Sequence, residues 1–214
     1  MSLLMAAVVL QFAPPARQEG YPFGNKTAEV RLDVYLDLHC PDSSDFFAVL
    51  LKAREGRIQG KALKELIDIR VHLFPLPYHY NSFAASSLAK WFELLHPDKY
   101  PAFVQLQFDS IEKYTSKALG LSVLEVRKLL INDGIAALAG EKDDSIYNVF
   151  EDQNIQLKTR GSYKFGSYTG VTGTPNYAVN GVLIQDEFSS ADSLVRYFEP
   201  YFNNGQSRLA TLAQ

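Results

Sequence analysis

The stretch Val30–Ser44, VRLDVYLDLHCPDSS, is the part of the sequence that decides the fold. Apolar and polar side chains alternate from Val30 to Asp37, and this period of two predicts a strand. Apolar residues then recur at helical spacing to about Arg54, which predicts a helix. Cys40, the only cysteine of the chain, lies at the junction between the two and directly before Pro41.

Cys40 therefore occupies a position that suits a reactive cysteine. Proline fits the first turn of a helix, where its missing N–H costs no hydrogen bond. A sulfur just before that turn faces free backbone N–H groups, whose dipoles favour the thiolate, the nucleophilic form. The alternative is a small buried apolar residue, as free cysteines often are. The local sequence leaves both interpretations open.

A second strand and a long helical block follow the first helix. The strand is predicted over Leu66–Phe74, with β-branched residues in alternation, and it stops at Pro75–Pro77 because proline cannot donate to a ladder. From Asn81 the apolar residues return to helical spacing. The helices predicted after the one that begins at Asn81 cover Pro97–Glu112, Ser122–Asn132 and Ser145 to about Phe165.

The C-terminal part of the sequence predicts a hairpin and a last helix. Asn180-Gly181 is a strong hairpin signal between the predicted strands Asn176–Val179 and Val182–Ile184. Ser189 is predicted to cap the final helix.

The order of these elements predicts an α/β fold with a mixed central sheet and helices on both faces. Strand–helix–strand implies a parallel pair with a right-handed crossover, and the hairpin adds antiparallel strands. The predicted organisation is a leader or signal remnant with an N-terminal extension over 1–28, a core over 29–80 and 166–203, an inserted helical subdomain over 81–165 and a tail over 204–214.

A second motif lies far downstream, in the stretch Gly170–Tyr177, GVTGTPNY. Together with the Cys-Pro-x-Ser start of the first helix, it resembles the DsbA-like branch of the thioredoxin superfamily. The resemblance implies a thioredoxin fold with an inserted helical subdomain. It also implies that Pro175 is cis and packs against the sulfur, while the backbone of Thr174 pairs with bound peptide or glutathione.

The chain is also similar to plant thioredoxin-superfamily proteins. These share the Cys-Pro-Asp-Ser turn and a segment like Val71–His79, VHLFPLPYH. Tyr78 and His79 follow the second parallel strand, and the carboxyl ends of parallel strands meet at one edge of the sheet. Both side chains are therefore candidates to line a cleft near Cys40.

Two departures from the family's pattern bear on activity. Its oxidoreductases use a second cysteine to resolve the mixed disulfide, and Ser43 stands there instead. A buried acid six residues before the first cysteine is replaced by Val34. Asp37, three residues before Cys40, would oppose thiolate formation as an anion unless it accepts a proton.

Three functions remain compatible with these residues. The first is monothiol thiol–disulfide exchange or isomerase activity that uses an external thiol such as glutathione on peptide or protein substrates. The second is a redox-inactive module that binds peptide or protein. The third is a glutathione-binding enzyme similar to kappa-class glutathione transferases.

The candidate site residues follow from the two motifs and the loop after the second strand. His39 is included because a cationic imidazole would stabilise a neighbouring thiolate. The predicted catalytic residues are Cys40, Ser43 and His39, and the predicted substrate-binding residues are Pro41, Thr174, Pro175, Tyr78 and His79. No cofactor other than glutathione as an external thiol is expected, and the four histidines show no zinc-motif spacing.

The composition and the N-terminal stretch bear on which classes of partner and which cellular location are expected. With 21 basic and 24 acidic residues the formal charge is −3, which gives no footprint for nucleic acid. The apolar stretch Leu3–Ala13 is too short to span a bilayer, so no integral membrane segment is expected. It resembles a secretory signal without the basic start. We therefore expect a secretory or extracellular location, with the cytoplasm as the alternative.

Overall fold

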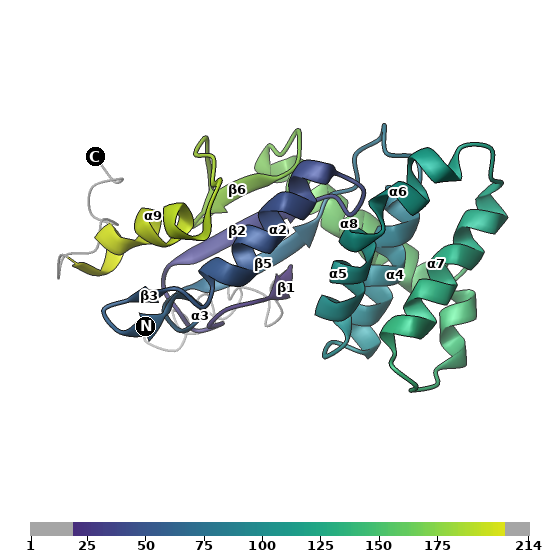
Figure 1. The fold of residues 1–214 in the computed structure, drawn as a ribbon, viewed down its shortest axis with the longest axis horizontal. Coiled ribbons are helices and arrows are strands. Elements are labelled where there is room, and N and C mark those ends of the chain that lie inside the picture. Colours follow the sequence, from purple (N-terminus) through teal and green to yellow (C-terminus); the bar gives the residue numbers. More distant parts are fainter. Residues whose placement is uncertain (1–18, 204–214) are drawn as a thin grey trace, which may run out of the picture.

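A computed structural model describes residues 19–203 of the chain, so the predicted leader and tail lie largely outside the described residues. None of the described helices combines the length and the apolar character needed to cross a bilayer. The elements are β1 (Tyr21–Pro22), β2 (Arg31–Leu36), α2 (Pro41–Ala53), β3 (Arg57–Ile58), β4 (Lys61–Ala62), α3 (Leu63–Leu66), β5 (Asp68–Leu73), α4 (Ser82–Leu95), α5 (Tyr100–Asp109), α6 (Ile111–Tyr114), η1 (Ser116–Ala118), α7 (Val123–Ala137), η2 (Asp144–Asn148), α8 (Gln153–Thr169), β6 (Asn176–Val179), β7 (Val182–Ile184) and α9 (Ala191–Asn203). In Figure 1 the sheet and the helices α2 and α9 that cover it form the left half of the molecule, and the helices α4, α5, α6 and α7 form the right half.

The main sheet has five strands in the order β1-β5-β2-β6-β7. β2 and β5 are parallel and joined through α2, with Arg31 opposite Asp68 and Leu36 opposite Leu73. β6 pairs antiparallel with β2, and β7 pairs antiparallel with β6. This is the predicted mixed sheet, with the parallel pair at its centre and the hairpin at one edge.

One face of the sheet carries the main hydrophobic core. Leu32, Val34 and Leu36 alternate along β2 and pack with buried residues of α2 and α9, among them Leu50 and Phe198. Such alternation places every second side chain on the same face. The first predicted strand and helix therefore pack directly on each other, which fixes the direction in which α2 leaves the sheet.

The opposite face carries polar side chains beneath α8. Asp33 accepts a hydrogen bond from Arg31 and lies 2.7 Å from Nε2 of His72, whose ring stacks between Tyr35 and Phe165. Burial would raise the pKa of Asp33, but the hydrogen bonds with His72 and Arg31 hold it below its usual value. His72 is therefore a structural residue of this face.

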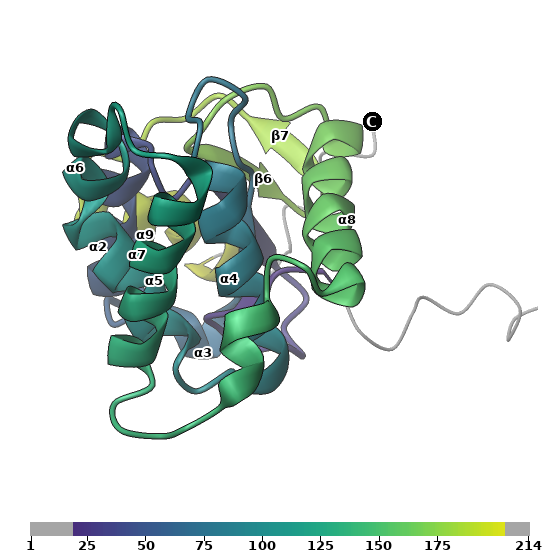
Figure 2. The same ribbon diagram turned by 90° about the vertical axis from the view of Figure 1, so that its right-hand side faces the viewer.

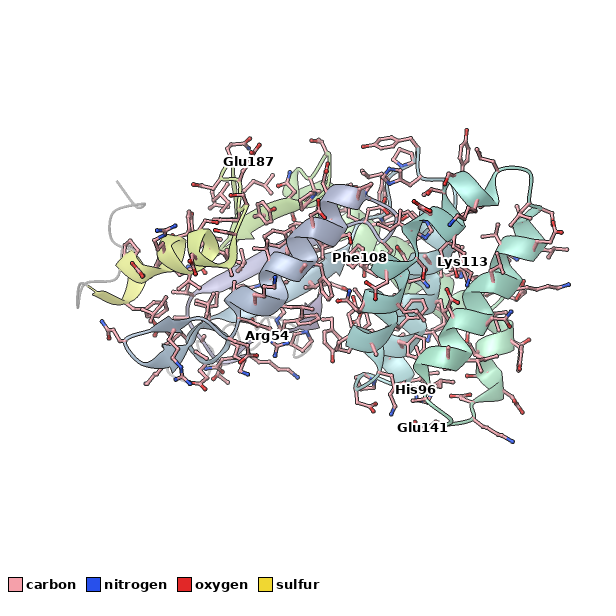
Figure 3. The ribbon with its side chains drawn as sticks, in the orientation of Figure 1. Arg54, His96, Phe108, Lys113, Glu141 and Glu187 are labelled. Atoms are coloured by element: carbon pink, nitrogen blue, oxygen red, sulfur yellow. The ribbon has the colours of Figure 1, made fainter. Side chains whose placement is uncertain are left out.

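The helical subdomain packs against the core through α5, which contacts α2, and through α8, which contacts β5. The rings of Phe47 on α2 and Phe108 on α5 lie 5.2 Å apart, and Figure 3 shows Phe108 pointing from α5 toward α2. Figure 2 shows α8 running alongside α4. Since α8 covers the sheet face of Tyr35 and runs through residue 165, the division predicted at that residue falls inside a helix.

Several predicted boundaries are wrong, each for a local reason. The second strand begins at Asp68 because Leu63–Leu66 forms the short helix α3. The last predicted helix of the block splits into η2 and α8, because the Asp152 side chain accepts from the backbone N–H of Ile155 and caps a new start. α9 is capped by Ser190 instead of Ser189, since the Ser190 hydroxyl accepts from the backbone N–H of Ser193.

Three short strands are absent from the predicted elements. β1 pairs antiparallel with β5, with Tyr21 opposite Val71. β3 and β4 form a separate two-stranded hairpin after α2. Two-residue strands have no period to detect, so their pairing depends on which backbone the fold places beside them.

The two glycines of α8 offer a test of its packing on the sheet. A Cβ on Gly166 would lie 2.7 Å from the ring of Phe74, whereas a Cβ on Gly161 would meet nothing within 4 Å. Gly166→Ala is therefore expected to lower the free energy of unfolding by about 1–3 kcal/mol through overpacking. Gly161→Ala is expected to raise it by about 0.5–1 kcal/mol, because alanine favours the helix. Urea unfolding of both variants measures the two effects, and the same sign in both would contradict the packing.

Candidate functional site

Cys40 lies where the sequence predicts it, at the N-terminal end of α2. It is the N-cap residue, with extended backbone, and Pro41 occupies the first turn. The side chain is only 5% exposed. Its sulfur donates a hydrogen bond to the backbone carbonyl of Thr174 at 3.3 Å. The two motifs that the sequence separates by more than a hundred residues therefore meet at this sulfur.

Thr174 and Pro175 reach the sulfur because they immediately precede β6. β6 pairs with β2, and Tyr35 near the end of β2 lies opposite Asn176 at the start of β6. The Thr174–Pro175 peptide bond is cis, as the resemblance implies. The hydroxyl oxygen of Thr174 is buried and has no hydrogen-bond partner among the described residues.

Ser43 is fully buried and has a partner other than the sulfur. Its hydroxyl oxygen accepts a hydrogen bond from the backbone N–H of Asp37 at 3.2 Å. The serine that replaces the second cysteine therefore ties the helix start back to the end of β2. The observed partner of the hydroxyl is thus a backbone N–H, and the catalytic role considered from the sequence stays a prediction.

His39 does not provide the cation considered from the sequence. The side chain is 1% exposed and stacks on Tyr114 of the helical subdomain, with ring centroids 5.2 Å apart. Burial lowers its pKa to about 4, with Asp37 opposing the shift and His79 adding to it. At neutral pH the ring is therefore uncharged, because protonating a buried imidazole would cost its hydration.

Asp37 is the group whose role the sequence leaves unrecognised. Its buried carboxylate accepts hydrogen bonds from the backbone N–H groups of His39 and Leu76, at 2.7 and 2.6 Å. Nδ1 of His79 lies 2.9 Å from its second oxygen, and the hydroxyl of Ser82 donates to the first. The only sequence signal was an acid at the end of a buried strand, because all of its partners except the backbone of His39 come from a loop and a helix start some forty residues away.

Tyr78 and His79 are neighbours in the loop after β5, but their side chains lie in different surroundings. His79 lines a cavity of about 290 Å³ with proline and aromatic side chains of that loop, α4 and α8. Tyr78 is 64% exposed, and its ring meets that of His79 edge to face at 4.9 Å without lining the cavity. Of the two candidates, His79 alone is connected to the Cys40 loop, through Asp37.

A larger groove begins at Thr174, whose carbonyl accepts the hydrogen bond from the sulfur, although Cys40 itself is not among the lining residues. It has a volume of about 630 Å³ and runs from Asp42 and Pro175 along β6 to the loop between β7 and α9. Its apolar side is an aromatic cluster in which Tyr177 contacts Phe46 and Phe188, at centroid distances of 4.6 and 5.1 Å. The site therefore combines one thiol, a backbone carbonyl and an adjacent groove.

The buried imidazole predicts a loss of stability in mild acid. Between pH 6.5 and about 4 the folded protein binds fewer protons at His39 than the unfolded chain does, so stability falls as the pH falls through this window. The loss amounts to about 3 kcal/mol, since one pKa unit corresponds to roughly 1.4 kcal/mol. His39→Phe keeps the stack on Tyr114 without titrating and should remove this part of the loss. Urea unfolding at pH 7 and pH 4 measures it, and an equal loss in both proteins would contradict the assignment.

Comparisons with known proteins bear on the fold. The sequence matches the family described as Thioredoxin over residues 17–198. No curated protein matches the chain. Among solved structures, alpha-DsbA1 of Wolbachia pipientis aligns with a TM-score of 0.59 and 20% identity, covering 91% of this chain and 93% of that one.

Two further structures have the same architecture. BdbD from Bacillus subtilis, in its oxidised form, aligns with a TM-score of 0.65 and 16% identity, covering 86% of this chain and 94% of that one. A protein-disulfide isomerase from Novosphingobium aromaticivorans aligns with a TM-score of 0.61 and 16% identity, covering 86% and 97%. These likenesses extend over the sheet and the helical subdomain alike and establish a DsbA-like form of the fold. With the family match spanning nearly all of the described residues, the chain belongs to the thioredoxin family.

Proposed function

We propose that the protein carries out thiol–disulfide exchange with one thiol of its own, Cys40, and a second thiol supplied from outside. The observation that carries the proposal is the position of the sulfur at the start of α2, 3.3 Å from the carbonyl of Thr174, a residue that lines the groove. Free N–H groups at a helix start interact favourably with negative charge, and the thiolate is the attacking form in thiol–disulfide exchange.

The proposed reaction balances without a second cysteine. The Cys40 thiolate attacks one sulfur of a substrate disulfide, so a Cys40–substrate S–S bond forms while the substrate's own S–S bond breaks. The other substrate sulfur leaves as a thiolate. A thiolate of glutathione type then attacks the substrate sulfur of the mixed disulfide, which releases the Cys40 thiolate and leaves a glutathione–substrate disulfide.

The remaining residues of the site have supporting roles in this proposal. Thr174 and Pro175 line the groove, and in this proposal the backbone of Thr174 pairs with an extended peptide. Asp37 and Ser43 hold the loop that carries Cys40. We assign them to positioning, because no contact with the sulfur is observed for either side chain.

Glutathione disulfide should convert Cys40 into a mixed disulfide in the folded protein. Reduced glutathione should then restore the free thiol, because the second attack needs only an external thiol. Intact-mass measurement reports one added glutathionyl group in the wild type and none in Cys40→Ser. An adduct that forms only after unfolding in urea would show that the sulfur is inaccessible in the folded protein. That result would contradict the proposed exchange function.

Ser43→Cys should remove the need for the external thiol. Residues at the N-cap and three positions later face each other across the first turn, within the span that a disulfide bridges. A second thiol there is expected to attack the mixed disulfide and shorten its lifetime by roughly tenfold or more, as resolving cysteines do. Ser44→Cys is the matched control, because its side chain leaves the helix in another direction. Equal adduct lifetimes in the two variants would contradict the resolving role of this position.

A redox-inactive binding module is the second candidate, and it is favoured by the 5% exposure of the Cys40 side chain. In this case the groove would hold peptide without covalent chemistry. Cys40→Ala should then leave the affinity for a bound peptide unchanged in a fluorescence anisotropy titration. Loss of binding on that single change would count against the module and support covalent capture.

A further inference from the structure

The groove beside Cys40 is lined by carboxylates along its length. Asp42 and Asp45 project from the first turns of α2, and Asp186 and Glu187 come from the loop between β7 and α9. All four are exposed, and no lysine, arginine or histidine lines the groove. Figure 3 shows Glu187 on this loop, on the side of the molecule away from Lys113 of the helical subdomain.

These carboxylates have no cationic partner within residues 19–203. Acidic residues elsewhere around the sheet do form ion pairs: Asp68 pairs with Arg70, and Glu55 pairs with Lys64. Asp42, Asp45, Asp186 and Glu187 form no ion pair with any described residue. The groove therefore presents a net negative charge that begins at Thr174, the residue whose carbonyl accepts the hydrogen bond from the Cys40 sulfur.

The floor of the groove is apolar and aromatic. Phe46, Tyr177 and Phe188 form a cluster with centroid distances between 4.6 and 6.4 Å. Burial and the neighbouring carboxylate of Glu187 raise the pKa of Tyr177, so its phenol stays neutral. Thr174, whose buried hydroxyl has no partner among the described residues, is also one of the residues that line this groove. An occupant must therefore supply apolar surface, polar backbone groups and positive charge.

We propose that this groove selects thiol or disulfide substrates in which lysine or arginine residues flank the reacting cysteine on an extended segment. The inference rests on the exchange function proposed above and adds the substrate class. Long basic side chains lay their alkyl stems on apolar surface and keep the charged head near water and carboxylates, which is the combination that the groove offers. No group of three or more His, Cys, Asp or Glu side chains that could hold a metal ion is found among the described residues.

The test compares two peptides that differ only in the residues flanking one cysteine, lysine in one and glutamate in the other. Each cysteine carries a neutral mercaptoethanol group as a mixed disulfide, and the rate of exchange with Cys40 is measured. The wild type is expected to react roughly tenfold faster with the lysine peptide at low salt, since complementary charge raises the association rate. The ratio should fall as sodium chloride is added, because exposed charges are screened.

The double variant Asp186→Asn with Glu187→Gln is expected to reduce that ratio to roughly threefold or less, because each exposed charge contributes modestly. Glu29→Gln with Asp144→Asn removes the same charge from exposed positions that do not line the groove. It should leave the ratio unchanged. An equal ratio in both double variants would overturn the assignment of the groove.

Serine versions of the two peptides separate this inference from the exchange function. Their affinities, measured by fluorescence anisotropy, do not depend on the chemistry of Cys40. If the lysine peptide binds more tightly while neither disulfide reacts, the exchange function fails and the groove selectivity stands. If both disulfides react at the same rate and both serine peptides bind equally, the exchange function stands and the groove selectivity fails.

Discussion

The buried carboxylate of Asp37 joins three segments on which the candidate site depends. It accepts hydrogen bonds from the backbone beside Cys40, from the loop after β5 and from the first residue of α4. A buried charge is tolerated only when it is hydrogen-bonded on all sides, and removing its partners leaves a large desolvation cost. The carboxylate thereby fixes the position of the thiol loop relative to both the sheet and the helical subdomain.

Ser43, at the position of the missing second cysteine, has a structural contact of its own. Ser43 does not stand in for a sulfur, since its hydroxyl accepts from the backbone of Asp37 and is closed to solvent. The space that a resolving thiol would need is thus used to hold the end of β2. The carbonyl of Thr174 is the sulfur's only hydrogen-bond partner among the described residues, so the proposed exchange at Cys40 needs a thiol from outside the chain.

The charges around the site are distributed unevenly. The imidazole beside the sulfur is neutral, because burial lowers the pKa of His39 to about 4. The groove on the other side carries unpaired carboxylates. Local electrostatics in the groove therefore favour an approaching cation over an approaching anion.

The sequence by itself determined the strand before Cys40, the helix that begins at Pro41 and the hairpin at Asn180-Gly181, because each depends on neighbouring residues and a regular period. It also predicted that Thr174 and Pro175 meet the sulfur, through a resemblance between two motifs. Only the tertiary structure decided the role of Asp37, the neutral state of His39 and the acidic groove. These arise from burial and from contacts between segments far apart in the chain, and no local pattern of residues records such contacts.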